Sequence, residues 1–219
     1  FEFNQAVADV FDNMLNRSVP FYSNILDQIV GFTDYYLKHS NLLSKMADDT
    51  LLSGTKNSVT LIDLGCSTGA LARRLIERQL DLNYIGVDSS VPMIKKAMSL
   101  ASNSIQFRVS DIRDLDSFSA VDIIVCNLVL QFVSVDERQQ LLERFFHNLP
   151  SGGMLIVVEK VHHYNSEIQA QYLSMFRDFK QNNGYSMDEI LNKEQSIQGV
   201  LISQTESWYE EQLKTIGFS

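Results

Sequence analysis

The segment from Val59 to Leu75 limits what this chain can fold into more than any other. Residues 59–64 are mostly apolar or β-branched, and they lead directly into a turn that contains Gly65 and Gly69. From Thr68 onward, apolar residues recur at helical spacing. The pattern predicts a buried parallel strand, a tight turn and a helix. In open α/β sheets such a turn lies at the carboxyl end of the strand, where ligands bind, and glycines let the backbone approach a ligand closely.

The spacing within this turn distinguishes two kinds of nucleotide site. A dinucleotide fingerprint needs G-x-G-x-x-G, which the turn lacks. From Asp63 to Gly69 it reads D-x-G-x-S-x-G, which resembles the first motif of class I S-adenosylmethionine-dependent methyltransferases. We therefore predict S-adenosylmethionine as the cofactor, with contacts from Asp63, Gly65, Cys66 and Ser67. A plain structural turn remains the alternative, because short glycine-containing strand ends are common.

Size and composition favour one domain spanning residues 1–219. The chain has 219 residues, 45% of them hydrophobic, which is enough to bury one substantial core. No apolar run reaches membrane-spanning length and no leader segment opens the chain, so we expect a cytoplasmic protein without membrane association. A formal net charge of −9 argues against tight direct binding of nucleic acid. Cys66 and Cys126 lack metal-ligand spacing, so we expect reduced, buried thiols and no metal site.

Residues 1–37 are predicted to form a helical lid. Two stretches of this region have apolar residues at helical spacing, and Pro20 marks the break between them. Residues 38–57 are polar and predict a loop, which could contain a short helix over 42–46.

Strand and helix patterns alternate after the first strand. Further strands are predicted at 82–88, 104–109, 121–127 and 154–159, and helices at 91–100 and 136–149. The strand over 121–127 is nearly all apolar, as a strand covered on both faces should be. The alternation predicts a doubly wound, Rossmann-like parallel sheet of the α/β class, with its core over 58–160.

The pattern changes after this core. Helices are predicted at 165–180, 186–192 and 205–216. The first two form a helical insertion over 161–200, beside the ligand end of the sheet. Class I methyltransferase sheets normally add a reversed C-terminal hairpin at this point. We expect that hairpin to lie beyond this sequence, because without it the strand over 154–159 would be an exposed apolar edge.

Polar side chains follow three predicted strand ends. Asp88 follows Gly65 by roughly 20 residues, the spacing at which a carboxylate receives two ribose hydroxyls. Capping of the next helix is the alternative role. Asp111 with Ile112 fits an adenine pocket, although Asp after a strand is also ordinary turn chemistry. Asn127 can donate and accept near the methionine part of the cofactor, or it can be a satisfied strand-end amide.

Other candidates lie near the last strand and the second helix of the core. Glu159 lies where the last strand opens into the site, which makes it a candidate for proton transfer. His162 and His163 follow it, but paired loop histidines are usually only solvated. Met93 and Cys66 are most simply packing residues, and we place both beside the cofactor.

Segments spread over nearly the whole chain carry a resemblance to a known family. They are Arg17-Ser-Val-Pro-Phe-Tyr-Ser-Asn24, Asp63-Leu-Gly-Cys-Ser67, Asn127-Leu-Val-Leu-Gln-Phe132, Glu159-Lys160 and Asp178-Phe-Lys-Gln-Asn-Asn-Gly-Tyr-Ser186. They resemble the carboxy-S-adenosylmethionine synthases, long described as tRNA wobble-uridine methyltransferases. The first and last segments are specific to that group.

That resemblance implies a reaction, an assembly and a set of contacts. Enzymes of the family take S-adenosylmethionine and prephenate and build a carboxylated sulfonium, which a partner enzyme uses on tRNA. The implied assembly is a homodimer. The implied cofactor contacts are Tyr22, Gly65, Cys66, Ser67, Asp88, Ser89, Asp111, Ile112 and Asn127.

One position departs from the family pattern in a way that affects chemistry. The family places an Arg after the Gly-Tyr-Ser helix to pair with the extra carboxylate, and this sequence has Glu194 there. A carboxylate in place of a guanidinium turns attraction into repulsion. Lys193 or Arg17 could supply the cation if the local alignment slips by one residue. The family's usual Asn after Asp88 is also replaced, by Ser89.

We therefore predict an S-adenosylmethionine-dependent methyltransferase that acts on a small molecule enclosed under the helical lid. Catalysis would be mainly positioning, because the sulfonium is already activated. The groups that could take a proton are Glu159, Tyr22 and Tyr185. Those that could bind the substrate are Arg17, Lys160 and Lys193. Carboxy-S-adenosylmethionine synthesis is one alternative, and a cofactor-binding partner subunit without catalytic activity is another.

Overall fold

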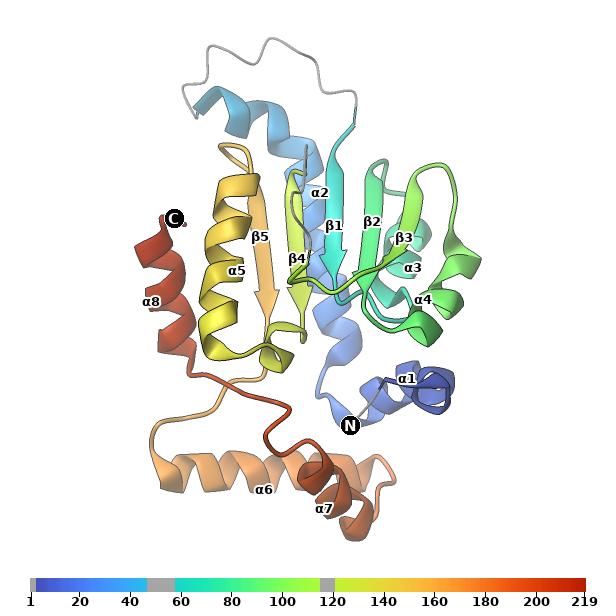
Figure 1. Cartoon of the computed structure of the whole chain (residues 1–219), viewed down its shortest axis with the longest axis vertical. Coiled ribbons are helices and arrows are strands. Elements are labelled where there is room, and N and C mark those ends of the chain that lie inside the picture. Colours follow the sequence, from blue (N-terminus) through green and yellow to red (C-terminus); the bar gives the residue numbers. More distant parts are fainter. Residues whose placement is uncertain (1–2, 47–57, 115–120) are drawn as a thin grey trace.

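Five parallel strands form the centre of the molecule, in the order β3-β2-β1-β4-β5 (Figure 1). The computed structural model describes residues 3–46, 58–114 and 121–219, and of residues 41–46 only the backbone. The strands are β1 (Thr60–Leu64), β2 (Asn83–Asp88), β3 (Ile105–Val109), β4 (Ile123–Asn127) and β5 (Met154–Val158). Every pairing is parallel, so the carboxyl ends of all the strands meet at one edge. The predicted doubly wound, Rossmann-like sheet is confirmed.

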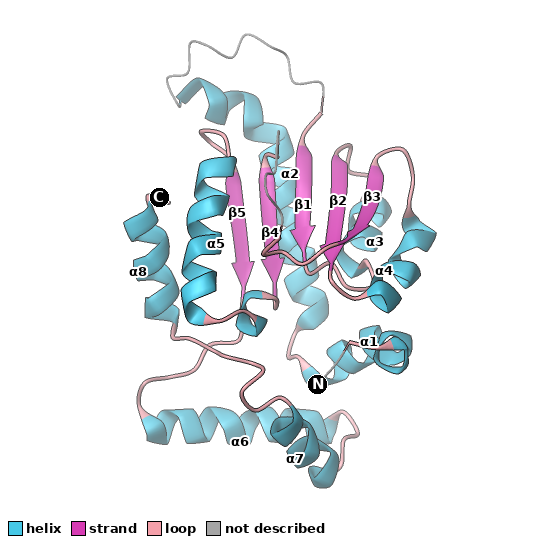
Figure 2. Ribbon diagram, viewed as in Figure 1, coloured by secondary structure: helices cyan, strands magenta, loops and turns pink. Residues whose placement is uncertain are grey.

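Helices cover both faces of the sheet and the space beyond its carboxyl ends (Figure 2). The helices are α1 (Gln5–Ser18), α2 (Tyr22–Met46), α3 (Ala70–Glu77), α4 (Val91–Ala97), α5 (Val135–Asn148), α6 (Ser166–Asn182), α7 (Met187–Ser196) and α8 (Glu206–Ile216). Two single turns of 3₁₀ helix are η1 (Met98–Leu100) and η2 (Leu130–Phe132). α2 and α3 pack on one face of the sheet and α5 and α8 on the other, whereas α1, α6 and α7 lie beyond the strand ends.

One predicted helix boundary is wrong. The helix expected to end at Leu37 continues as α2 to Met46, and residues 47–57 of the predicted loop lie outside the described residues. Polar composition suggested a loop, but residues 38–46 contain neither Gly nor Pro, which would stop a helix. In addition, Lys38 pairs with Asp34 one turn earlier at 2.6 Å. The alternation of strand and helix is also incomplete, since the described part of the connection between β3 and β4 contains no helix.

Side chains of the strands alternate between two hydrophobic cores, one on each face of the sheet. In β4, Ile123 and Val125 pack with α2 and α3, whereas Ile124 and Cys126 pack with α5 and α8. All of these side chains are fully buried, which explains the unbroken apolar run in the sequence. Cys126 and Cys66 are buried and unbridged, as predicted.

The periphery is less fully covered than the core. β5 lies at the edge of the sheet, and its residues are each partly exposed. The apolar side predicted for α6 is only half covered, since Tyr172 and Met175 are 56% and 67% exposed. Of the residues that form α6, only Lys180 is buried. This helix therefore projects beyond the sheet, touching the rest of the chain along one narrow side.

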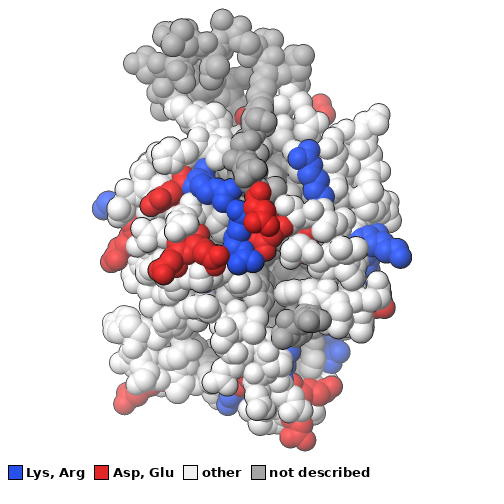
Figure 3. All heavy atoms as spheres, viewed as in Figure 1, with Lys and Arg blue, Asp and Glu red and all other residues white. Residues whose placement is uncertain are grey.

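The described residues include neither a membrane-spanning helix nor a cluster of metal-ligating side chains. No helix among the described residues combines the length and apolar character needed to cross a bilayer. In the same part of the chain, no three His, Cys, Asp or Glu side chains gather as a metal ion would need. On the face drawn in Figure 3, basic side chains lie beside acidic ones and do not form one extended positive patch. Arg113 pairs with Asp111 and Glu137 at 2.7 and 3.3 Å.

The buried side chain of Arg138 joins three parts of the fold. It lies on α5, fully buried. Its guanidinium donates to the hydroxyl of Tyr209 on α8 at 2.9 Å, and to the carbonyl oxygens of Val133 and Ile202 at 3.0 and 2.7 Å. Ile202 lies on the segment that returns from α7 to α8. One side chain therefore fixes the path by which the chain comes back from the helices beyond the sheet.

Replacing Arg138 by Met should lower the free energy of unfolding by about 3–5 kcal/mol, because buried oxygen acceptors lose their charged donor. The matched control is Arg108→Met, which alters an exposed Arg on β3 and should change stability by less than about 0.5 kcal/mol. Chemical denaturation of both variants measures the difference. Equal losses in the two variants would contradict the role assigned to Arg138.

Candidate functional site

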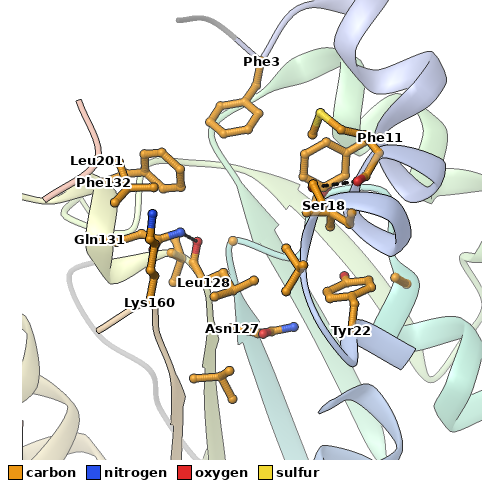
Figure 4. A pocket seen from close by; sticks show the side chains of 18 of the residues that line it. Phe3, Phe11, Ser18, Tyr22, Asn127, Leu128, Gln131, Phe132, Lys160 and Leu201 are labelled. Atoms are coloured by element: carbon orange, nitrogen blue, oxygen red, sulfur yellow. Dashed lines mark hydrogen bonds between the residues drawn. The ribbon is translucent and has the colours of Figure 1, made fainter. Parts of the chain in front are cut away.

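A cavity of about 960 Å³ lies at the carboxyl ends of the strands, enclosed by α1, α6 and α7. This volume can hold a nucleoside-sized ligand together with a small second molecule. All the residues predicted for cofactor binding, proton transfer and substrate binding line it: Arg17, Tyr22, Asp63, Gly65, Cys66, Ser67, Asp88, Ser89, Met93, Asp111, Ile112, Asn127, Glu159, Lys160, Tyr185 and Lys193. Figure 4 shows part of this lining, contributed by segments far apart in the sequence.

The turn after β1 exposes its backbone to this cavity. Gly65, Ser67 and Gly69 have φ angles of 76°, 52° and 80°, in the left-handed region. A Cβ atom on Gly65 would lie 2.6 Å from Cγ2 of Val129, so only glycine fits there. Ser67 takes the left-handed conformation without being glycine, and its backbone N–H donates to Oδ2 of Asp88 at 3.0 Å. That hydrogen bond helps to stabilise a conformation that is otherwise unfavourable.

Two backbone donors fix the carboxylate of Asp88 at the end of β2. Its Oδ1 accepts from the N–H of Ser90 at 2.8 Å, and its Oδ2 accepts from the N–H of Ser67 at 3.0 Å. Burial raises the pKa of this carboxyl. The side chain of Ser90 caps α4 by accepting from the N–H of Met93, so capping does not need the Asp88 carboxylate. This arrangement favours the predicted ribose contact over the helix-capping alternative.

Asp63 and Tyr22 are two buried polar residues in the cavity lining. Asp63 is 3% exposed, and its Oδ2 accepts from the hydroxyl of Tyr84 at 2.6 Å. Burial raises the pKa of Asp63 to about 7. Burial also raises the pKa of Tyr22, and the charge of Asp63 adds to that effect. A phenol with a raised pKa stays protonated at neutral pH, so Tyr22 suits hydrogen-bond donation to a ligand better than the predicted proton transfer.

Asp111, the carboxylate predicted to contact adenine, is already paired with Arg113. Arg113 donates from Nε to Oδ1 of Asp111 at 2.9 Å and from Nη2 to Oδ2 at 2.7 Å. These bonds lower the pKa of Asp111. The carboxylate stays ionised and keeps further lone pairs for a ligand donor. Ile112 beside it is buried and offers apolar surface to the same cavity.

Two buried amide oxygens on the cavity lining lack partners. Oδ1 of Asn127 and Oε1 of Gln131 accept no hydrogen bond within the described part of the chain. Both residues line the cavity (Figure 4). Because an unsatisfied buried acceptor is unfavourable, these atoms are suited to a donor group on a bound ligand, such as an ammonium. This observation favours a ligand contact for Asn127 over a satisfied strand-end amide.

Glu159, the predicted proton acceptor, is held by backbone donors. Its Oε1 accepts from the N–H groups of Val129 and Leu130 at 3.0 and 2.7 Å, and its Oε2 accepts from that of Gln131 at 3.0 Å. Burial raises the pKa of Glu159 to about 7. With both oxygens engaged at the start of η2, Glu159 shapes the loop that carries Gln131. Its contacts support a positioning role more than proton transfer.

α1 closes the cavity over the turn after β1. Oδ1 of Asp12 accepts from the hydroxyl of Thr68, and the carbonyl oxygen of Phe3 accepts from the hydroxyl of Ser90 at 2.6 Å. The ring of Phe3 packs edge-on against Phe132, with centroids 5.5 Å apart, so the N-terminal segment reaches η2 (Figure 4). The sequence did not indicate Asp12, because nothing in an amphipathic helix marks which carboxylate will meet a distant turn.

The part of the cavity formed by α6 and α7 carries cations. Lys160 follows β5, Lys180 lies on α6 and Lys193 lies on α7, and we call these residues the lysine wall. The Nζ atoms of Lys180 and Lys160 lie 4.2 and 5.1 Å from the ring centroid of Phe176. Burial lowers the pKa of each lysine, to about 8 for Lys193. The sequence indicated Lys160 and Lys193 but not Lys180. The available signal was that Lys180 follows Phe176 by one helical turn, which places both side chains on the same face of α6.

Glu194, at the position that differs from the family pattern, is paired with Arg177. Arg177 donates from Nε to Oε1 of Glu194 at 3.1 Å and from Nη2 to Oε2 at 2.6 Å. These bonds lower the pKa of Glu194. The expected repulsion of a ligand carboxylate is therefore offset, because a guanidinium on α6 faces the carboxylate on α7. The sequence did not indicate this pair, since Arg177 lies on a different helix.

Arg17 and Tyr185 form a separate contact. Arg17 donates from Nε and Nη2 to the carbonyl oxygens of Asn183 and Gly184 at 2.8 and 3.0 Å. Its guanidinium lies 4.3 Å from the ring centroid of Tyr185. Arg17 therefore fastens the turn between α6 and α7 and orients Tyr185, which fits a structural role better than the predicted substrate contact. His162 is not among the described residues that line the cavity, and its Nδ1 lies 3.1 Å from the hydroxyl of Ser203.

Comparison with known proteins gives a domain match and full-length relatives. Residues 61–153 match the family model described as a methyltransferase domain. The chain is 35% identical over 224 residues to the carboxy-S-adenosyl-L-methionine synthase of Helicobacter hepaticus, covering 100% of this chain and 87% of the relative. It is 33% identical over 221 residues to the enzyme of the same name from Campylobacter fetus, covering 100% of this chain and 86% of the relative.

Solved structures with a similar architecture include two methyltransferases with bound SAH. The plantazolicin methyltransferase BpumL in complex with SAH matches with a TM-score of 0.63 and 22% identity, over 95% of this chain and 68% of that one. The magnesium protoporphyrin IX methyltransferase ChlM from Synechocystis PCC 6803 with bound SAH matches with a TM-score of 0.63 and 15% identity, over 99% and 86% of the two chains. At these identities the likeness shows a common fold.

Asp88→Ala should weaken the binding of S-adenosylhomocysteine by about 10-fold to 100-fold, because a charged acceptor for two hydroxyls is lost. Asp88→Asn keeps one acceptor oxygen and should lie between this variant and the unchanged chain. Asp81→Ala, at an exposed position before β2, is the matched control. Calorimetric titration measures all three variants, and undiminished binding by Asp88→Ala would rule out the ribose contact.

Asp63→Asn should reduce the loss of stability as pH rises from about 4 to 7. Over that range the unfolded chain has released the Asp63 proton while the folded chain, with a pKa of about 7, still holds it. Unfolding therefore releases a proton, and stability falls with pH by up to about 1.4 kcal/mol per pH unit. Asn cannot ionise, so the variant should lack this contribution. Denaturation curves at several pH values measure the difference, and identical slopes would contradict it.

Proposed function

The chain belongs to the carboxy-S-adenosyl-L-methionine synthase family, and from this premise we propose that it builds carboxy-S-adenosylmethionine from S-adenosylmethionine and prephenate. It has the S-adenosylmethionine-binding fold of class I methyltransferases and is a transferase that uses this cofactor. The observation that carries the proposal is the lysine wall, which lines the same cavity as the predicted cofactor residues. Positive charge there suits a second substrate that bears carboxylates.

The residues at the strand ends fit the cofactor. Gly65 and Asn127 both line the cavity, and Oδ1 of Asn127 accepts no hydrogen bond from the described residues. Asp88 would hold the ribose, Asp111 and Ile112 the adenine, and Asn127 the methionine ammonium. When bound, the cofactor supplies an activated sulfonium. The protein then has to orient two molecules and exclude water.

The residues on the other side of the cavity would hold the second substrate. The lysine wall would bind its negative groups, and Tyr185, oriented by Arg17, would line its ring side. Phe3 and Phe132, which pack edge-on against each other in the cavity lining, would help to keep water from the reacting groups. The resemblance adds two elements to the proposal: a homodimeric assembly and use of the product by a partner enzyme that acts on tRNA.

Glu194 favours a second candidate, methyl transfer to a small acceptor. This carboxylate stands where the family pattern has an Arg, and although Arg177 balances its charge, Glu194 lines the cavity. An acceptor without an extra carboxylate would not need a guanidinium there. A cofactor-binding subunit without catalytic activity is the remaining alternative.

Incubation of the full chain with S-adenosylmethionine and prephenate should yield the carboxylated sulfonium, detected by mass spectrometry. Omitting prephenate and using Asp88→Ala are the two controls, and both should abolish or strongly reduce the product. A methylated product from a pool of small acceptors, with no carboxylated sulfonium, would instead favour the methyltransferase. Binding of the cofactor with neither product would favour the non-catalytic subunit. Either of these results would overturn the proposal.

A further inference from the structure

Asp111, at the end of β3, is held in one orientation by Arg113. The guanidinium donates from Nε to Oδ1 of Asp111 at 2.9 Å and from Nη2 to Oδ2 at 2.7 Å. The backbone N–H of Arg113 donates to Oδ1 as well, at 2.9 Å. Because a planar guanidinium matches the plane of a carboxylate, the paired bonds restrict rotation of the Asp111 side chain.

The two oxygens of this carboxylate differ in the number of hydrogen bonds that they accept. Oδ1 accepts two and Oδ2 accepts one, all from Arg113. A carboxylate oxygen has about two acceptor sites, so the described residues fill those of Oδ1 and leave one on Oδ2. Asp111 and Arg113 both line the cavity. A hydrogen-bond donor on a bound ligand would therefore meet Oδ2.

Helix α5 holds Arg113 at two points. Oε1 of Glu137 accepts from Nη1 of Arg113 at 3.3 Å, and Nη1 of Arg144 donates to the carbonyl oxygen of Arg113 at 2.8 Å. Glu137 is itself placed by Ser134, the residue that caps α5, whose hydroxyl donates to Oε2 at 2.6 Å. The chain that leaves β3 crosses in front of the sheet towards α5 (Figure 1). The start of α5 therefore fixes the segment that carries Asp111.

Stability is a poor explanation for these contacts. The side chains of Arg113, Asp111 and Glu137 are 49%, 29% and 44% exposed. Exposed ion pairs typically add little to folding stability, because water screens the charges and long side chains lose freedom. What the bidentate geometry provides is a single orientation of the carboxylate. A fixed orientation matters where that carboxylate has to meet a donor on a ligand.

The residue between Asp111 and Arg113 adds an apolar surface to the same place. Ile112 is 6% exposed and lines the cavity. An apolar side chain packs favourably against the face of a flat ring, whereas Oδ2 can accept from a donor at the edge of such a ring. A purine with an exocyclic amine offers both features.

We propose that Arg113 is a positioning residue for recognition of the adenine ring. By fixing Asp111 it directs Oδ2 to the exocyclic amine, and Glu137 on α5 holds Arg113 in place. The selectivity of the site for a purine that bears an amino group therefore depends on two side chains that act through Asp111. This role rests on the proposed function for the identity of the cofactor, and not for the group that is transferred.

Calorimetry on the full chain compares two ligands that differ in one group: S-adenosylhomocysteine, and its analogue in which hydrogen replaces the exocyclic amino group. Arg113→Met should weaken binding of S-adenosylhomocysteine by about threefold to tenfold and change binding of the analogue by less than about twofold, because only the amine meets Asp111. Arg113→Lys keeps the charge but lacks the paired donors, so it should resemble Arg113→Met. Arg108→Met, at an exposed position on β3, is the matched control.

A double-variant cycle tests whether Arg113 acts through Asp111. Asp111→Ala should remove most of the preference for the amino-bearing ligand, and adding Arg113→Met should then weaken binding by less than about twofold. Glu137→Gln should cause a loss of about twofold to threefold, because Arg113 keeps its direct bonds to Asp111. Glu143→Gln, at an exposed position on the same helix, is the control. Denaturation midpoints close to that of the unchanged chain would show that each variant is folded.

Equal losses for the two ligands in Arg113→Met, or unchanged binding of both, would overturn the role of Arg113. A full further loss in the double variant would show that Arg113 does not act through Asp111. The expected selectivity in a chain that makes no carboxylated sulfonium from prephenate would refute the proposed function and leave this role intact. Carboxylated product from a chain whose selectivity ignores Arg113 would do the reverse, and no binding of S-adenosylhomocysteine by the unchanged chain would overturn both.

Discussion

The hydrogen bond from the Ser67 N–H to Asp88 is the contact on which the cofactor half of the cavity depends. It joins the turn after β1 to the end of β2, and it helps to hold Ser67 in a left-handed conformation. The same turn brings Gly65 so close to Val129 that no side chain fits between β1 and the loop after β4. The ends of three neighbouring strands are thus set relative to one another before any ligand binds.

The other half of the cavity is built on helices, and buried charges fix its position. Glu159 accepts from consecutive backbone N–H groups of η2, which orients the loop that carries Gln131. Arg138 binds the segment that returns from α7. Arg138 is fully buried and Glu159 is partly buried, and each makes three hydrogen bonds that offset the cost of removing its charge from water. Arg138 and Glu159 position other residues, so a buried charged side chain in this fold is not by itself a sign of a catalytic group.

Position 194 shows why a substitution cannot be interpreted without its neighbours. A Glu in place of an Arg would repel a carboxylate if it stood alone. In this fold Arg177 faces Glu194 from an adjacent helix, and the lysine wall lines the same cavity as Glu194. The local charge therefore depends on residues from β5, α6 and α7 together. The family resemblance and the altered residue are compatible once this surrounding charge is included.

The sequence by itself determined the sheet, the ligand end and the residues that line it, because strand periodicity and glycine spacing are local properties that the backbone must obey. Asp88, Asn127 and the turn after β1 could be found in this way. Tertiary structure alone decided which polar groups meet: Arg177 with Glu194, Asp12 with Thr68, and Glu159 with η2. It also decided that Lys180 completes a cluster with Lys160. Electrostatic interactions depend on distances of a few ångströms in space, and the order of the residues along the chain does not determine those distances.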